Sequence, residues 1–228
     1  MKTLKALVCD LDGTLIDTAP GIADTLNDFL AEHGRGGLAP ATVKGFIGDG
    51  AARLVQRAFA ATGESVDGPA LDTLAAAYSA RLAARPPGPA DVFPGVAETL
   101  ARLAGDGLGL AVCSNKPQAA VATALSSAGL AQHFQVLIGG DSLAERKPSA
   151  APLLAAVAGL GVPPGAAAMV GDNEVDVATA RAAGIAVVAV TYGYARVPMA
   201  DLGADLLIDG FAALPDALER LEARGQGR

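Results

Sequence analysis

The chain has no run of basic residues, only two cysteines and no unbroken apolar stretch that could span a membrane. Its 228 residues include 17 Lys or Arg against 24 Asp or Glu, which gives a formal net charge of −7. This acidic balance argues against nucleic acid or an anionic membrane as a partner. A membrane span needs about 20 consecutive apolar residues. Prolines and glycines interrupt the uncharged stretch 149–171, so we expect an interior helix, a turn and a strand there.

The two cysteines, Cys9 and Cys113, each end an apolar run. We therefore expect buried core thiols in a reducing cytosol rather than a disulfide. The first carboxylate comes too early for the apolar region of a secretory signal, so we expect a cytoplasmic location. Length and a hydrophobic content of 51% suit a globular chain of one or two domains. No apolar face clearly exceeds what such a core needs, which leaves a monomer or a homodimer.

The most informative stretch is an apolar run, residues 6–9, that leads directly into Asp10 and Asp12. Such a run predicts a strand buried on both faces of a parallel sheet, with the two acids at its carboxyl end. Two like charges in a buried place are costly unless a cation neutralises them. Carboxylate oxygens suit a hard divalent ion, and Mg²⁺ is the natural choice. The alternative is a surface turn with acidic and glycine residues.

The rest of the chain divides into a helical part and an alternating part. Helical periodicity is present at 18–33, 51–61 and 69–84, no strand pattern lies between them, and prolines at 86–89 indicate a stiff linker. Beyond the linker, strands are expected at 108–113, 134–138, 167–170, 185–190 and 206–208, with helices between and after them. This order predicts an α/β fold with a doubly wound, Rossmann-like parallel sheet. We expect a core of residues 1–17 plus 90–228 and an inserted α-helical cap of residues 18–89, either a cover for the site or a passive decoration.

Polar residues stand at several places where the strands of such a sheet end. Besides the first acid pair, these are Ser114-Asn115, Lys147-Pro148 and Gly171-Asp172 followed by Asp176. The carboxyl ends of the strands converge on one crevice, so these side chains are expected to meet. Each signal alone is also typical of an ordinary helix cap or helix start. Together they favour phosphoryl transfer.

In that chemistry each residue type has a task. Asp10 can attack phosphorus to form an aspartyl-phosphate, and Asp12 can protonate the leaving oxygen and then activate water. Lys147 offsets charge on the transferring group. Asp172 completes a Mg²⁺ shell with Asp10 and a backbone carbonyl of Asp12. Asp176 can bind a metal-held water or fix Lys147.

Further residues are expected to bind the substrate itself. The hydroxyl of Ser114 and the amides near Gly13, Thr14 and Asn115 can donate to phosphate oxygens. A small phosphorylated acid also needs cationic or amide donors for its carboxylate. The amides of Gly48, Asp49 and Gly50 and the guanidinium of Arg53 are candidates, although Arg53 could equally lie on a solvated face.

These residues resemble the motifs of the haloacid dehalogenase superfamily. Residues 10–15 are similar to its first motif, Ser114-Asn115 to its second, Lys147-Pro148 to its third, and Gly171-Asp172 with Asp176 to its fourth. The resemblance covers essentially the whole chain. It implies a Rossmann-like core with a helical cap and a Mg²⁺-dependent aspartyl-phosphate mechanism.

Within the superfamily the chain looks most like the phosphoglycolate phosphatases, on stretches 17–18, 47–51, 93–96 and 190–194. It departs from them at Ala150, where relatives often carry a second proline. The resemblance implies hydrolysis of 2-phosphoglycolate, a small phosphorylated metabolite. A sugar phosphate, an amino-sugar phosphate and pyrophosphate remain alternative substrates. Asp12 disfavours a dehalogenase, Gly171 disfavours a phosphomutase, and the complete set of polar residues disfavours a non-catalytic phosphoryl-group sensor.

Overall fold

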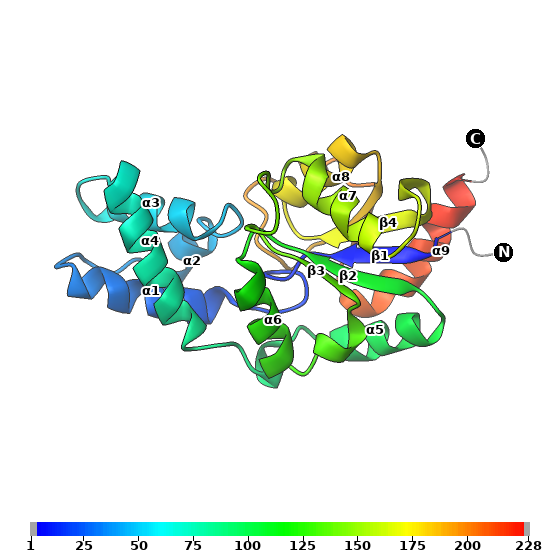
Figure 1. Cartoon of the computed structure of the whole chain (residues 1–228), viewed down its shortest axis with the longest axis horizontal. Helices are drawn as coiled ribbons and strands as arrows, with labels where there is room; N and C mark the ends of the chain where they lie inside the picture. The colour runs from blue at the N-terminus through cyan, green and yellow to red at the C-terminus, as the bar shows by residue number, and fades with distance from the viewer. Residues whose placement is uncertain (1–3, 226–228) are drawn as a thin grey trace.

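The computed structural model describes residues 4–225, and its centre is a six-stranded, wholly parallel sheet (Figure 1). The strands are β1 (Ala6–Cys9), β2 (Gly109–Cys113), β3 (Val136–Ile138), β4 (Ala167–Gly171), β5 (Ala186–Val190) and β6 (Leu206–Ile208). Their order in the sheet is β3-β2-β1-β4-β5-β6, so β1 lies in the middle with β2 and β4 on either side. Helices cover both faces, which confirms the expected doubly wound α/β class.

Successive side chains of β1 point to opposite faces of the sheet, and both faces are buried, so the strand carries no polar residues. Five of the described helices cover the two faces of the sheet, namely α5 (Val96–Gly105), α6 (Gln118–Ser127), α7 (Ala150–Gly159), α8 (Glu174–Ala183) and α9 (Leu214–Gly225). Leu7 and Cys9 point to a cluster built with α5, α6 and α9, whereas Ala6 and Val8 point to one built with α7 and α8. Both faces are therefore dry, and every residue of the strand is buried.

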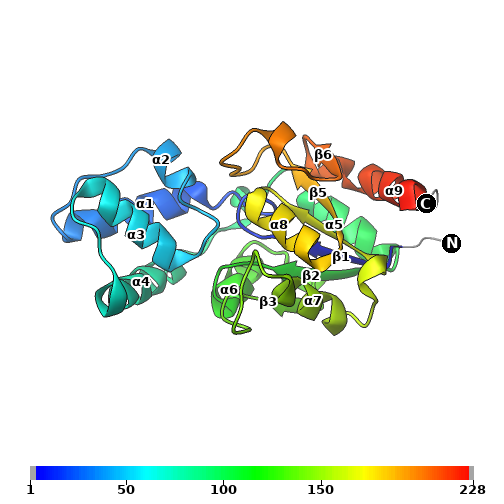
Figure 2. The same ribbon diagram turned by 90° about the horizontal axis from the view of Figure 1, so that it is seen from above.

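Four helices between β1 and β2 form a separate group, called the helical unit below (Figure 2). They are α1 (Ala19–Glu32), α2 (Pro40–Lys44), α3 (Ala51–Thr62) and α4 (Gly68–Ala83). Leu26, Phe29, Val55, Phe59 and Tyr78 are among the residues of their own buried cluster. Three of the helices were expected. The five-residue α2 was not, because it is too short to show a period.

Several smaller expectations also have an outcome. Cys9 and Cys113 are free and buried, as predicted. The proline linker does not stay extended, because Pro89–Asp91 forms a 3₁₀ turn (η1) before the chain re-enters the sheet region. Among the described residues, no helix is both long and apolar enough to cross a bilayer.

Candidate active site

A buried lysine and three buried carboxylates lie together at the carboxyl end of the sheet. Lys147 Nζ is 2.9 Å from Asp10 Oδ1 and 2.7 Å from Asp176 Oδ1, and its side chain is 2% exposed. One oxygen from each of Asp10, Asp172 and Asp176 lies within 4.8 Å of the others. The pairing of β1 with β4 explains this, because Cys9 is in register with Val170 and the acids follow both strands. The predicted convergence of these four residues is confirmed.

Asp176 caps a helix and also holds Lys147, and holding Lys147 was one of the two roles expected of it. Its Oδ2 accepts N–H bonds from Asp172 (3.0 Å) and Asn173 (3.3 Å), while its Oδ1 accepts from Lys147. The Asn173 side chain in turn accepts from the Val175 N–H at 2.8 Å. This is a capping box at the start of α8, and the same carboxylate fixes the lysine.

Burial is the main influence on the protonation of these carboxylates. Burial raises the pKa of Asp10 to about 7, and the nearby charge of Asp176 adds to this, whereas Lys147 opposes it. Burial and the charges of Asp176 and Asp10 also raise the pKa of Asp172 well above its usual range. The pKa of Lys147 is raised because its two acidic neighbours outweigh its burial. One ammonium facing three carboxylates leaves the cluster short of positive charge.

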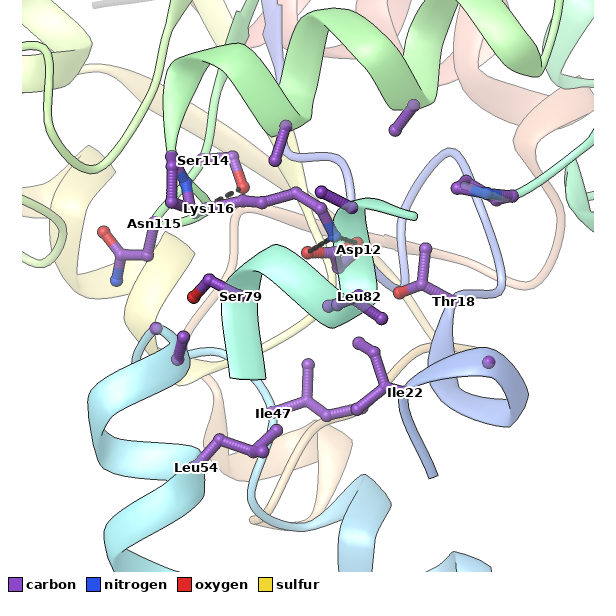
Figure 3. A pocket seen from close by; sticks show the side chains of 18 of the residues that line it. Asp12, Thr18, Ile22, Ile47, Leu54, Ser79, Leu82, Ser114, Asn115 and Lys116 are labelled. Carbon is purple, nitrogen blue, oxygen red and sulfur yellow. Dashed lines mark hydrogen bonds and ion pairs between the residues drawn. The ribbon is translucent and has the colours of Figure 1, made fainter. Parts of the chain in front are cut away.

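Asp12 lies beside this cluster and has a partner that sequence reasoning missed. Lys116 Nζ is 2.9 Å from Asp12 Oδ1 and 3.2 Å from Oδ2 (Figure 3). The two side chains are 12% and 15% exposed. The Lys116 N–H also donates to the hydroxyl of Ser114 at 3.3 Å. The available signal was position, since the lysine directly follows Ser114-Asn115.

Asn115 and Gly13 support the site from two sides. The Asn115 side-chain amide donates to the carbonyls of Gly48 and Lys147, each at 3.0 Å, and so ties the helical unit to the sheet. Gly13 has φ +88°, and a Cβ there would collide with the Asp172 carboxylate and the Tyr194 ring. Glycine is therefore required at position 13 by the close approach of Asp172 and Tyr194 as well as by the positive φ of the backbone.

Tyr194 holds Asp172 through its backbone and the start of α1 through its hydroxyl. Its N–H donates to Asp172 Oδ2 at 2.5 Å, and its hydroxyl donates to Asp17 at 2.7 Å and accepts from the Ala19 N–H at 3.0 Å. Sequence reasoning did not foresee this contact. Thr14 is fully buried outside the pocket, and its carbonyl accepts from the Tyr192 hydroxyl at 2.8 Å.

A pocket of about 200 Å³ lies between the sheet and the helical unit. Figure 3 shows Ile22, Ile47, Leu54 and Leu82 of the helical unit facing Asp12 and Lys116 of the sheet side. The residues that line the pocket also include Asp10, Ser114, Asn115, Lys147, Gly48 and Gly50. The floor is charged and the roof is largely apolar.

The structure does not bring Asp49 or Arg53 into the pocket. Asp49 Oδ2 lies 2.6 Å from Arg57 Nη1 and also contacts Arg196 of the sheet side. Arg53 is exposed and donates to the Gln56 side chain at 2.7 Å. Its helix buries the face that contains Leu54, so Arg53 is on the solvated side, which was the alternative interpretation.

The fold and this site define the class of protein. Residues 7–190 match the haloacid dehalogenase-like hydrolases, and the chain belongs to that family. A phosphoglycolate phosphatase of Rhodospirillum rubrum is 46% identical over 218 residues, covering 94% of this chain and 90% of that protein. A plasmid phosphoglycolate phosphatase of Cupriavidus necator is 43% identical over 220 residues, covering 93% and 92%.

A solved structure agrees with these relatives. A protein described as a predicted phosphoglycolate phosphatase from Haemophilus somnus superposes with a TM-score of 0.87 at 31% identity, covering 95% of this chain and 99% of that one. The expected resemblance to the phosphoglycolate phosphatases is thereby confirmed. The matches support a phosphatase of this family, a phosphoric monoester hydrolase.

Proposed function

We propose that this protein hydrolyses 2-phosphoglycolate to glycolate and phosphate, with Mg²⁺, through an aspartyl-phosphate on Asp10. The observation that carries the proposal is the buried cluster of Asp10, Lys147, Asp172 and Asp176 beside a small pocket. The substrate follows from the relatives named above, which are called phosphoglycolate phosphatases.

The donor set fits Mg²⁺. Three buried carboxylates with one ammonium make a site that needs more positive charge, and hard cations prefer such oxygens. Asp176 already serves Lys147 and two backbone amides. Asp10 and Asp172 would therefore hold the ion together with the Asp12 carbonyl. When bound, Mg²⁺ supplies positive charge beside the transferring phosphoryl group.

The residues of the chain divide the two chemical steps. Asp10 attacks phosphorus, the bond to the ester oxygen breaks, and Asp12 gives that oxygen a proton so that glycolate leaves. Asp12 then takes a proton from water, the hydroxide attacks phosphorus, and the bond to Asp10 breaks to release phosphate. Lys147 orients Asp10 and favours its ionised form through their 2.9 Å ion pair.

Phosphoryl oxygens are bound in both steps by neutral donors. The Ser114 hydroxyl and the amides of Gly13 and Asn115 are the groups we assign to this task. Ser114 and Asn115 line the pocket, and Gly13 lies against Asp172.

We also propose that residues 18–89 act as a cap domain on a core of residues 1–17 plus 90–228. The helical unit supplies the apolar roof of the pocket, so its approach would exclude water from the reacting phosphorus. A pocket of about 200 Å³ suits a two-carbon acid better than the larger sugar phosphates and amino-sugar phosphates, whereas pyrophosphate, which is as small as 2-phosphoglycolate, is left to the substrate panel. The cytoplasmic location and the monomeric or homodimeric state stay predictions.

The test is phosphate release from 2-phosphoglycolate and from p-nitrophenyl phosphate, with Mg²⁺ and with EDTA. We expect turnover with Mg²⁺ and none with EDTA. In Asp10→Asn we expect kcat to fall by at least ~10³-fold, because the nucleophile is gone. The exposed Asp24 offers a matched control, since Asp24→Asn should keep wild-type turnover. Full turnover of Asp10→Asn would refute the nucleophile, and preference for another phosphate ester across a metabolite panel would refute the substrate.

A further inference from the structure

The pocket contains one ammonium group that the reaction described above does not use. Among the described residues, three cationic side chains line the pocket, namely Arg85, Lys116 and Lys147. Lys147 is occupied by Asp10 and Asp176. The Arg85 side chain is 58% exposed and pairs with Asp28, away from the reacting carboxylates. Lys116 is 12% exposed and extends toward Asp12, as Figure 3 shows.

The Lys116–Asp12 pair cannot persist while Asp12 protonates a leaving oxygen. Asp12 shares both carboxylate oxygens with the ammonium, at 2.9 and 3.2 Å. When Asp12 turns to the substrate, Lys116 would remain as an unpaired charge facing an apolar roof that includes Ile47, Leu54 and Leu82. A charge left in such surroundings is costly, so a replacement anion is required.

The proposed substrate carries that anion. In 2-phosphoglycolate a carboxylate lies one carbon from the ester oxygen, so phosphate at Asp10 leaves the carboxylate inside the same pocket. A carboxylate facing an apolar roof needs a charged donor. Lys116 is the cation that lies beside Asp12, the residue that must reach the ester oxygen.

We propose that Lys116 determines specificity by binding the second anionic group of a small phosphorylated acid, which replaces Asp12 as the partner of its ammonium. As the second anion takes over the ammonium, Asp12 takes up a proton from solvent, so every remaining charge is paired and the neutral Asp12 carboxyl can turn toward the ester oxygen. This inference rests on the proposed phosphatase function, and it adds the residue that recognises the carboxylate of the substrate.

Two substrates of almost equal size isolate the second anion. 2-Phosphoglycolate carries the carboxylate, and 2-hydroxyethyl phosphate carries a neutral CH₂OH in its place. Lys116→Met keeps the length of the side chain and removes the charge. We expect this substitution to lower kcat/KM by roughly 30- to 300-fold for 2-phosphoglycolate and by less than about threefold for 2-hydroxyethyl phosphate. Arg85→Gln, which removes the rival cation, should leave the ratio of the two substrates unchanged.

Binding without turnover gives a second measurement. In an Asp10→Asn background with Mg²⁺, calorimetry should show that Lys116→Met weakens 2-phosphoglycolate at least about 30-fold and 2-hydroxyethyl phosphate less than about threefold. If Lys116→Met has a lower Tm than the wild type, Lys116→Gln is used to repeat the experiment. Turnover and binding together distinguish the phosphatase mechanism from the role of Lys116, because selective binding of 2-phosphoglycolate does not require Asp10 to be the nucleophile.

Three results would overturn the assignment. The wild type could treat both substrates alike, Lys116→Met could lower both equally, or Arg85→Gln could be the variant that changes their ratio. In each case Mg²⁺-dependent hydrolysis of p-nitrophenyl phosphate would still support the phosphatase. Loss of that hydrolysis in the wild type would instead contradict the proposed function, leaving calorimetry to decide on Lys116.

Discussion

The sheet core and the helical unit hold their charged side chains in different ways. In the core, Lys147 is 2% exposed and has two carboxylate partners within 2.9 Å. On the helical unit, the Arg81–Glu32 pair has side chains that are 33% and 55% exposed. A buried charged side chain must keep its partner, because an unpaired buried charge is costly. A surface ion pair contributes little to stability, so other residues can replace it. We therefore expect the core to fix the chemistry, whereas the roof that the helical unit supplies can vary.

Removing the central cation of the core should have the largest effect. Lys147→Met keeps the volume but leaves Asp10 and Asp176 buried without a positive partner. We expect kcat to fall by at least ~10³-fold and the free energy of unfolding to fall by about 3 kcal/mol. Turnover of p-nitrophenyl phosphate and urea unfolding measure the two quantities. The exposed Lys5 provides the control Lys5→Met, which should match the wild type in both.

If Lys147→Met instead kept wild-type stability, the buried cluster would not differ from the surface pairs of the helical unit, and the contrast above would be wrong.

Close packing around Asp172 predicts the next effect. Gly13→Ala combines a positive φ of +88° with a methyl group that meets the Asp172 carboxylate and the Tyr194 ring. We expect a loss of about 2–4 kcal/mol in the free energy of unfolding and roughly a tenfold rise in the Mg²⁺ concentration for half-maximal activity. Gly34 also has a positive φ, +68°, but open space around it, so Gly34→Ala measures the backbone strain alone. Equal losses in the two variants would rule out the collision with Asp172.

The raised pKa of Asp172 predicts how pH acts on the metal-free protein. Because burial raises this pKa, the folded state keeps a proton that the unfolded chain releases, and stability falls as pH rises through the raised value. Asp172→Asn has no such proton to lose. In EDTA, the Tm of the variant minus that of the wild type should therefore increase between pH 5 and pH 8, by roughly 3–6 °C.

Two comparisons sharpen this test. Asp24→Asn, at an exposed site, should show no such pH-dependent difference. Adding Mg²⁺ at pH 8 should stabilise the wild type more than Asp172→Asn, because one ligand is missing in the variant. A Tm difference that stays constant from pH 5 to pH 8 would show that Asp172 ionises normally in the folded protein.

The same contrast accounts for what the sequence could predict. Asp10, Asp172 and Lys147 were predictable because acids directly after a buried strand require a neutralising partner, and parallel strands bring their ends together. The three longer helices of the helical unit were predictable from their periodicity, and the five-residue α2 was not. A local sequence pattern is therefore enough to predict an element or a site residue where burial restricts which residues can stand there.

Residues that no local sequence pattern marks were not predictable. Lys116 meets Asp12 across 104 positions of chain, and the Tyr194 N–H meets Asp172 across 22. Neither contact leaves a local pattern, since a lysine after a strand and a tyrosine in a loop are common. Arg53 shows the converse, because a guanidinium near a glycine loop suggested substrate binding, yet the buried face of α3 directs it to solvent.

The smallest expected effect tests the contact between the two regions. Arg196 bonds Glu174 at the start of α8 and Asp49 of the helical unit, and its side chain is 24% exposed. Arg181 bonds Asp205 at 3.0 Å with both partners in the core, so Arg181→Gln is a matched control. Each substitution should cost no more than about 1 kcal/mol in the free energy of unfolding, since surface pairs are weak.

Arg196→Gln alone should raise KM for 2-phosphoglycolate, by about two- to fivefold with kcat unchanged, because only this variant loosens the roof of the pocket relative to its floor. An equal KM in both variants would mean that the Arg196 contact does not help to position the helical unit during binding.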